Sequence, residues 1–132
     1  MIINYIILGL VISFSSQTEN WTTYYENDNF EVFYRSQRCN DVKNGFDFSF
    51  YLIKVTNKTQ NTIVVDFVLG NPVSPSQREE DKIILILKEN ESKQGTCYGY
   101  ENLRLYISYN ITQKKIATKK FELSNINFVK IK

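Results

Sequence analysis

Two apolar arms between Phe46 and Leu69 constrain the fold of this chain more than any other part of the sequence. In the first arm, apolar residues occupy every second position, namely Phe46, Phe48, Phe50 and Leu52. In the second arm the same period recurs, at Ile63, Val65, Phe67 and Leu69. A period of two is that of a β-strand with one buried face. The polar run Asn57–Asn61 suits a turn, so we expect two strands folded back on each other, with their phenylalanines in the core.

The first arm also contains an irregularity. Its apolar face switches after Leu52, and Ile53 and Val55 continue the pattern on the other face. A switch of this kind predicts a bulge, or a strand that passes from one sheet to another.

Short segments of the same kind make up most of the remaining chain. Further strands are expected at Phe30–Arg35, Lys82–Lys88, Asn102–Tyr109, Ile116–Leu123 and Ile126–Ile131. The loops between strands are expected at Ser36–Gly45, Gly70–Asp81 and Glu89–Tyr100. About seven strands at short spacing and no helix predict an all-β fold, an antiparallel β-sandwich of immunoglobulin-like type, with a small barrel as the alternative.

Two of these segments carry further expectations. The strand Lys82–Lys88 is apolar on both faces, which favours a central position in its sheet. The loop Gly70–Asp81 contains Pro72 and Pro75, so no regular element is expected to run through it.

Lysines gather at the end of the chain, at Lys114, Lys115, Lys119, Lys120, Lys130 and Lys132. They indicate an edge strand protected against pairing with another chain, or else an anionic envelope surface as partner.

The first sixteen residues are typical of a signal peptide. Tyr5–Phe14 is an apolar run of ten residues, whereas a bilayer span needs about 20. Small residues suited to signal-peptidase cleavage follow, so we expect the mature chain to begin at Ser16 or Gln17. The alternative is a buried N-terminal strand or helix. Residues 17–132 are expected to form one domain without a transmembrane anchor, because no second long apolar run occurs.

The two cysteines agree with export. Cys39 and Cys97 both lie in the predicted mature part, and an oxidising compartment favours their pairing. Such a bond would contribute about 4 kcal/mol in the chain-entropy model. The alternative is a pair of free thiols, reactive or metal-binding, but metal ligation has little support because the chain has no His and no CxxC spacing.

The composition excludes several chemistries. Because the chain has no His, Ser–His and Cys–His nucleophile pairs and His-ligated zinc are impossible. A formal net charge of +2 is too small a bias to indicate nucleic acid. Carboxylate catalysis stays open through Glu79–Asp81, although such a run before an apolar strand is typical of a solvated gatekeeper. Glu26–Asn29 has oxygen ligands suited to calcium but lacks the spacing of a calcium loop. We therefore expect no metal and no cofactor.

Aromatic residues outside the expected core are candidates for a binding surface. Tyr98 and Tyr100 lie in a Gly-bearing loop beside Cys97, and an arm or short strand near the start of the mature chain carries Trp21, Tyr24 and Tyr25. Exposed aromatic rings stack on sugars and anchor protein partners. The alternative is that these rings cover sheet edges and close the core. The loop Gly70–Asp81 is expected to lie beside Tyr98 and Tyr100 in the binding surface.

The order of several motifs resembles small secreted proteins of Bacteroidetes bacteria. These motifs are Trp21–Tyr25, Phe30–Val32, Cys39, Lys54–Thr59, Gly95–Cys97 and Phe121–Asn125, and they cover most of the mature chain. The resemblance implies an exported envelope protein, periplasmic or secreted, and it carries over no functional residue. Together these observations predict a non-catalytic binding or accessory domain for a protein or glycan of the cell envelope. The alternatives are an inhibitor or immunity-type protein, and a hydrolase that uses carboxylates alone.

Overall fold

A computed structural model describes residues 20–98, 103–109 and 120–131. The predicted signal peptide 1–16 and its cleavage positions lie outside the described residues, as do Tyr100 and the expected strand start at 116–119. Within the described parts of the chain, no helix is long and apolar enough to cross a membrane.

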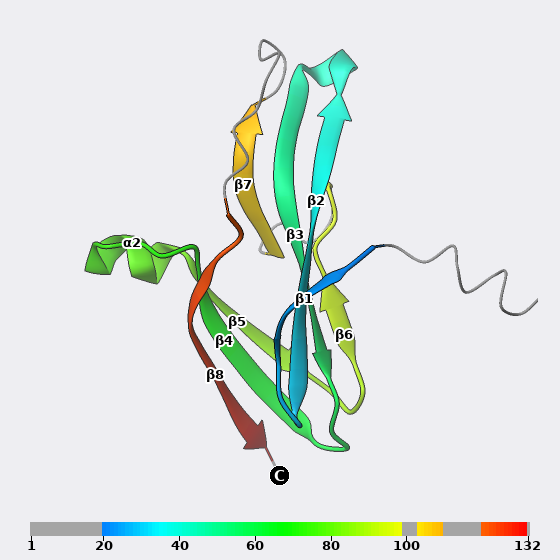
Figure 1. Cartoon of the computed structure of the whole chain (residues 1–132), viewed down its shortest axis with the longest axis vertical. Coiled ribbons are helices and arrows are strands. Elements are labelled where there is room, and N and C mark those ends of the chain that lie inside the picture. Colours follow the sequence, from blue (N-terminus) through cyan, green and yellow to red (C-terminus); the bar gives the residue numbers. More distant parts are fainter. Residues whose placement is uncertain (1–19, 99–102, 110–119, 132) are drawn as a thin grey trace, which may run out of the picture.

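The described residues form an all-β structure of two antiparallel sheets, as expected from the sequence (Figure 1). Sheet A contains β1 (Thr22–Glu26), β2 (Phe30–Asp41), β3 (Phe46–Asn57), β6 (Ser92–Gln94) and β7 (Arg104–Tyr109). Sheet B contains β4 (Thr62–Leu69), β5 (Lys82–Leu87) and β8 (Leu123–Ile131). The order in sheet A is β1-β2-β3, and β6 and β7 both pair with β3 at different heights. The order in sheet B is β5-β4-β8.

The two apolar arms identified in the sequence are β3 and β4, but they do not pair with each other. β3 belongs to sheet A and β4 to sheet B, so the expected hairpin is wrong. The chain changes sheets between Asn57 and Thr62, and the two strands face each other across the core. The period of two is the same in either arrangement, because it reports one buried face and not the partner strand.

A fully buried asparagine organises this change of sheets. The side-chain amide of Asn57 donates to the carbonyl oxygens of Asn61 at 2.7 Å, Lys88 at 2.8 Å and Leu87 at 3.2 Å. Its carbonyl oxygen accepts from the backbone N–H of Thr59 at 2.9 Å. The side chain thus joins the turn after β3 to the end of β5 and satisfies polar groups that have no strand partner.

The core lies between the two sheets and is built from both. Sheet A contributes residues of β2 and β3, and sheet B contributes the inward positions of all its strands; the largest fully buried side chains of this core are Phe30, Phe67, Ile53, Ile63, Leu87 and Leu103. Phe67 lies on β4, the middle strand of sheet B, which confirms it as a core residue. Aromatic rings extend the core at one end, where Tyr34 and Phe121 stack at 4.2 Å.

The paired strands β2 and β3 are longer than the sequence predicted. Their register runs from Phe30 opposite Asn57 to Asp41 opposite Phe46 without a shift, so the expected loop Ser36–Gly45 is wrong over most of its length. The actual connection is a 3-10 turn at Val42–Asn44 followed by Gly45, which has a φ of +76°. Polar residues extend β2 because the backbone pairing with β3 does not require apolar side chains.

The change of apolar face in β3 does not mark a change of sheet, because β3 stays in sheet A over its whole length. Its pairing with β2 has no register shift, but its pairing with β7 shifts between Ser49 and Phe50, so a bulge does lie close to the position that the sequence indicated. Figure 1 shows the upper parts of β2, β3 and β7 extending beyond sheet B. Ile53 and Val55 face sheet B, whereas Phe46 and Phe48 lie on the opposite face of sheet A and are only partly buried. The switch in pattern therefore separates the part of β3 opposite sheet B from the part beyond it.

β5 is an edge strand and not a central one. Among the strands of the described residues it pairs with β4 alone, and its side chains alternate between buried and exposed. Ile84 and Ile86 point away from the core although they are large and apolar. Burial among the described residues therefore accounts for the apolar character of only one face of β5.

The Pro-bearing loop contains a short helix, α2 (Pro75–Glu80), where no regular element was expected. Ser74 precedes it, and the Ser74 hydroxyl accepts from the backbone N–H of Gln77 at 3.2 Å. Pro75 takes the first helical position, where its missing N–H costs nothing and its fixed φ suits the helix. Proline interrupts the interior of a helix or strand, but at the first position of a helix it is favourable, and Pro75 occupies that position in α2.

The last strand is continuous through the expected break. β8 includes Ser124 and Asn125, and a register shift opposite Asp66–Val68 absorbs the extra residues. Asn125 has a φ of +52°, which asparagine tolerates better than most residues. β8 lies at the edge of sheet B, as the lysine-rich end of the chain indicated.

Candidate functional site

The candidate site lies on the outer face of sheet A, the face turned away from sheet B. Alternate residues of β3 present a line of rings there, with centroids 6.1 Å apart for Phe46–Phe48 and 6.0 Å apart for Phe48–Phe50. Tyr106 of β7 extends the group sideways and lies 6.1 Å from both Phe48 and Phe50. Phe46 is 50% exposed, so the expected burial of this phenylalanine in the core is wrong. These rings form a surface instead.

The segment after β6 closes one side of this surface. Cys97 forms the expected disulfide with Cys39, whose register partner on β3 is Phe48. The hydroxyl of the following residue, Tyr98, donates to the carbonyl oxygen of Asn40 at 2.8 Å. The segment is therefore attached to β2 by one covalent bond and one hydrogen bond, and it lies next to the phenylalanine rings.

Arg104 of β7 holds the same segment from the other side. Its guanidinium donates to the carbonyl oxygen of Cys97 at 2.5 Å and lies 4.7 Å from the centroid of the Phe50 ring. Before the disulfide, the chain passes so close to Leu103 that an added Cβ at Gly95 would lie 2.1 Å from the Leu103 carbonyl oxygen. Only glycine fits at that point, because any other side chain would overlap the backbone.

Together these groups enclose a pocket of about 290 Å³, which we call the aromatic pocket. It is lined by Cys39, Phe46, Phe48, Phe50, Cys97, Tyr98 and Arg104. The walls are rings and a disulfide, and the polar groups are one guanidinium and one phenol. A space of this size lies at the lower end of ligand pockets and fits a single large side chain or a small ring system.

The predicted binding residues do not gather at one place. Tyr98 lines the aromatic pocket and is 67% exposed, whereas Tyr100 lies outside the described residues. Tyr25 packs on Phe30, with ring centroids 5.6 Å apart. Phe30 and Asn40 are ten positions apart on β2, a separation of about 33 Å, so Tyr25 and Tyr98 are at opposite ends of the strand.

Trp21 and Tyr24 have different surroundings. The Arg35 guanidinium lies 5.1 Å and the Lys54 ammonium 5.7 Å from the Trp21 ring centroid, which places this ring on the outer face of sheet A. Tyr24 contacts Phe121 edge to face at 4.9 Å, and its hydroxyl donates to the carbonyl oxygen of Leu123 at 3.1 Å. The Tyr24 ring therefore joins sheet A to sheet B.

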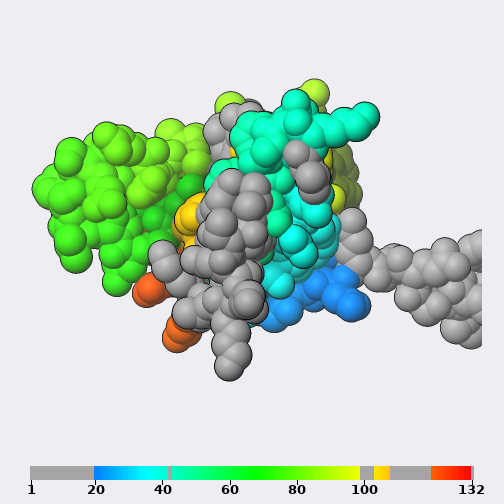
Figure 2. Space-filling view, turned by 90° about the horizontal axis from the view of Figure 1, so that it is seen from above, coloured from blue at the N-terminus to red at the C-terminus, as the bar shows by residue number. Residues whose placement is uncertain are grey.

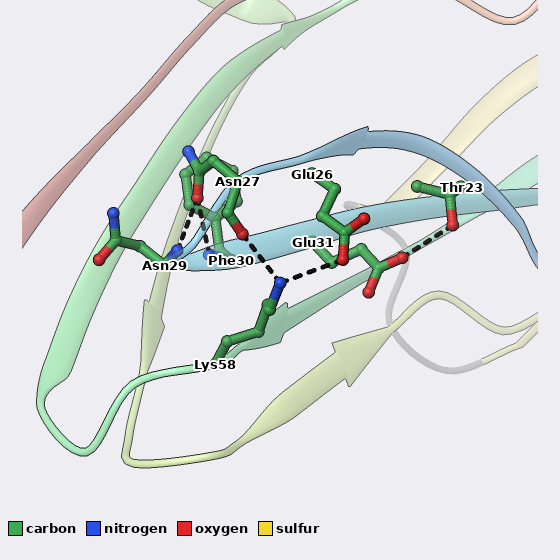
Figure 3. Close-up of polar contacts among 7 residues, drawn as sticks. All are labelled: Thr23, Glu26, Asn27, Asn29, Phe30, Glu31 and Lys58. Atoms are coloured by element: carbon green, nitrogen blue, oxygen red, sulfur yellow. Dashed lines mark hydrogen bonds and ion pairs between the residues drawn. The ribbon is translucent and has the colours of Figure 1, made fainter.

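The oxygen-rich segment Glu26–Asn29 has a structural arrangement (Figure 3). The side-chain oxygen of Asn27 accepts from the backbone N–H groups of Asn29 and Phe30, at 2.8 and 2.9 Å, and so forms the turn between β1 and β2. The Lys58 ammonium lies 3.0 Å from a Glu26 carboxylate oxygen and 2.9 Å from the Asn27 carbonyl oxygen. A lysine thus takes the place that a cation would need. Nowhere in the described part of the chain do three His, Cys, Asp or Glu side chains form a group that could hold a metal ion.

The acidic run Glu79–Asp81 lies elsewhere, around the end of α2. Glu79 and Arg78 border a hollow of about 560 Å³ beside sheet B, and Asp66 and Lys82 line it from the sheet. The loop Gly70–Asp81 therefore lies on sheet B, apart from Tyr98 on the outer face of sheet A.

The sequence pointed to Tyr98 and the disulfide but missed the rings that make the pocket. Phe46, Phe48 and Phe50 were assigned to the core because a period of two shows that a face is apolar and not what covers it. The signal that distinguishes them is the switch of apolar face after Leu52, which coincides with the limit of sheet B.

No family model matches the sequence, and neither a curated protein nor a solved structure shows significant similarity to this chain.

Proposed function

We propose that this protein is an exported, non-catalytic binding domain whose aromatic pocket takes an apolar side chain of a protein partner. The observation that carries the proposal is the cluster of partly exposed rings around Phe48, held beside a disulfide-anchored wall. Soluble domains rarely expose several contiguous large rings without a binding role, and aromatic residues dominate the energetics of protein interfaces. The two sheets over one core support an immunoglobulin-like sandwich as the scaffold.

The lining of the pocket favours a protein partner over a glycan. A sugar carries a hydroxyl on most ring carbons, and each hydroxyl that is buried without a partner costs free energy. Among the described residues that line the pocket, the polar side chains are the Arg104 guanidinium and the Tyr98 phenol, and each already donates one hydrogen bond to a backbone carbonyl oxygen. A leucine or phenylalanine side chain needs no such partners and gains from burial against rings.

The disulfide supports export. Cys39 is almost fully buried and paired with Cys97, and such bonds persist in oxidising compartments such as the periplasm and the extracellular space. An inhibitor or immunity-type protein also binds a protein partner and falls within this proposal. A hydrolase that uses carboxylates alone has no support at the pocket, because none of the described residues that line it carries a carboxylate.

Nuclear magnetic resonance with small probes tests the proposal. We expect N-acetyl-phenylalanine amide and N-acetyl-leucine amide to shift the ring resonances of Phe48, Tyr98 and Tyr106, with millimolar affinity, and methyl glucoside to leave them unchanged. Phe46→Ala should weaken the binding of the phenylalanine probe at least about fivefold, because this exposed ring lines the pocket.

The matched control is Val73→Ala, which removes an exposed apolar side chain far from the pocket and should leave probe binding unchanged. If the glucoside shifts these resonances and the amino-acid probes do not, the ligand is a glycan and not a protein side chain. Saturating probe concentrations that move none of the three rings would remove the site altogether.

A further inference from the structure

Three cations lie on the outer face of sheet A, beside the aromatic pocket. Arg35, Leu52 and Arg104 are register partners in one row across β2, β3 and β7. Lys54 lies two positions further along β3, on the same face as Leu52. We call Arg35, Lys54 and Arg104 the cationic band. The band borders the pocket directly, because the Arg104 guanidinium lies 4.7 Å from the ring centroid of Phe50, and both residues line the pocket.

Aromatic rings hold the cations of this band against the sheet. The Lys54 ammonium lies 5.7 Å from the Trp21 ring centroid and 5.2 Å from that of Phe33. The Arg35 guanidinium lies 5.1 Å from the same Trp21 centroid. A cation at such a distance from a ring is attracted to it, so these charges have fixed positions before any partner binds.

Lys54 has no charged partner in the described part of the chain. Its ammonium contacts rings but forms neither a hydrogen bond nor an ion pair there. On the outer face between Glu31 and Asp41, the described residues include no carboxylate, and Glu31 itself accepts from the Thr23 hydroxyl at 2.7 Å. The acidic run Glu79–Asp81 lies apart, since Figures 1 and 2 show α2 projecting to one side of the body.

A partner that fills the aromatic pocket also covers the cationic band. An interface of ordinary size buries about 800 Å² on each partner, which corresponds to a circle with a radius of about 16 Å. Phe50 and Lys54 are four positions apart on β3, a separation of about 13 Å. The Lys54 ammonium therefore lies within the area that such a partner covers. A charge removed from water in this way costs free energy unless an opposite charge pairs with it.

We propose that the protein partner is acidic beside its apolar side chain, and that one of its carboxylates pairs with the Lys54 ammonium. This inference rests on the proposed function and specifies the chemistry of the partner. The segment from Gly95, whose N–H donates to the Ile53 carbonyl oxygen at 2.8 Å, to Cys97 at Cys39 crosses the face between Lys54 and the pocket. A flexible stretch of about five residues spans the distance over this segment.

An acidic protein segment matches the cationic band better than a nucleic acid does. Proteins that bind nucleic acid commonly neutralise about 6–10 phosphates. The band offers the charges of Arg35, Lys54 and Arg104, and the formal net charge of the whole chain is +2. One or two carboxylates are enough to balance charges of this number.

The fluorescence of Trp21, the single tryptophan of the chain, measures binding at the band directly. The probes are N-acetylated peptide amides with a phenylalanine at one end and two aspartates at the other, joined by about five Gly and Ser residues. Each is made in both chain directions, and its control has two asparagines in place of the aspartates. In one direction we expect the aspartate peptide to bind at least about threefold more tightly than its control in low salt, and equally well in high salt.

A lysine variant locates the carboxylate. Lys54→Gln should remove the difference between the aspartate and asparagine peptides. It should leave the binding of N-acetyl-phenylalanine amide unchanged, because Lys54 is not among the residues that line the pocket. The matched control is Lys82→Gln on the outer face of sheet B, which should change neither result. Circular dichroism confirms that each variant is folded, and a difference that persists in Lys54→Gln would contradict the pairing with this ammonium.

The remaining outcomes separate this inference from the proposed function. Equal affinities of the aspartate and asparagine peptides in both directions, with normal binding of N-acetyl-phenylalanine amide, would overturn the acidic partner and leave the pocket in place. Failure of N-acetyl-phenylalanine amide itself removes the proposed function, and this inference with it. A short oligothymidylate that binds more tightly than the aspartate peptides, and less tightly to Lys54→Gln, would make the ligand a nucleic acid and also overturn the proposal.

Discussion

Asn57 shows how one side chain fixes the path of the chain between two sheets. Its amide serves three carbonyl oxygens, of Asn61, Leu87 and Lys88, at a fully buried position. In Asn57→Ala the Lys88 carbonyl keeps the Glu91 N–H and the Asn61 carbonyl keeps the Thr59 hydroxyl, each at 3.0 Å. The Leu87 carbonyl loses the amide donor and the Thr59 N–H loses its acceptor, and each buried polar group that loses its partner costs about 1–3 kcal/mol. We expect a loss of about 2–4 kcal/mol in the free energy of unfolding, measured in urea. Asn44→Ala removes an exposed amide bonded to Asp41 and should cost less than about 0.5 kcal/mol; equal losses would contradict the role of Asn57.

Tyr51 links the stability of the core to alkaline pH. Burial, with a smaller contribution from nearby Tyr34, raises the pKa of the Tyr51 hydroxyl above its usual value. The folded protein therefore holds this proton more tightly than the unfolded chain. The stability that results is complete below about pH 10, the pKa in the unfolded chain, and is lost as the pH rises further.

Tyr51→Phe should remove this part of the pH dependence. The difference in unfolding free energy between wild type and variant at pH 8 should shrink as the pH rises beyond about 10. Urea titrations of both proteins across this range measure it. A difference that stays constant with pH would show that Tyr51 contributes through its other contacts alone.

At the scale of elements, the segment between β6 and β7 depends on one close approach. A Cβ at residue 95 would lie 2.1 Å from the backbone oxygen of Leu103, so Gly95→Ala must displace β7 or the segment that leads to the disulfide. We expect a loss of about 1–3 kcal/mol in stability, together with weaker binding of N-acetyl-phenylalanine amide. Gly70→Ala is the control: Gly70 has a φ of +70° but open space around it, so the variant should lose stability and keep its pocket. Normal probe binding by Gly95→Ala would contradict this account.

The elements also show what the sequence could predict. The positions of β3, β4 and β7 follow from the period of two, and the position of β5 follows from a short continuous apolar run. The disulfide follows from two cysteines in a chain that is predicted to be exported. Which strands pair with each other cannot be predicted in this way, because the sequence Asn57–Asn61 fits a hairpin turn and a crossing between two sheets equally well. The predicted strand ends at Arg35, six residues before the end of β2, because the second half of β2 is polar. The helix α2 was missed because Pro75 reads as a breaker unless Ser74 is recognised as its cap.

The candidate site was predictable only in part, for the same physical reason. Alternation in the sequence identifies an apolar face, but tertiary structure decides whether another sheet covers it. Phe48 and Ile86 are both apolar residues on regular strands, and both lie on faces turned away from the core. In each case more apolar residues are present than one core needs, and the additional ones lie at the surface, around the aromatic pocket on sheet A and at Ile84 and Ile86 on sheet B.

At the scale of the whole molecule, export determines whether the disulfide forms. The prediction is that the protein recovered from the periplasm or medium begins at Ser16 or Gln17, since the apolar run ends there in small residues. N-terminal sequencing of this material measures it. A version without residues 2–14 should remain in the cytoplasm with both thiols reduced. Exported protein that still begins at Met1 would refute the signal peptide.

The disulfide contributes to both stability and binding. Cys39–Cys97 joins two residues that are 58 positions apart in the sequence, and the same bond anchors a wall of the pocket. Loss of the bond should cost about 4 kcal/mol through the entropy of the unfolded chain, a large share of the roughly 5–15 kcal/mol of a typical domain. We expect Cys39→Ala with Cys97→Ala to show this loss in urea. Near-wild-type stability would contradict it, as would two titratable thiols in unreduced wild-type protein. Where the variant is still folded, it should also bind N-acetyl-phenylalanine amide more weakly, because the segment that carries Tyr98 then loses its covalent attachment to β2.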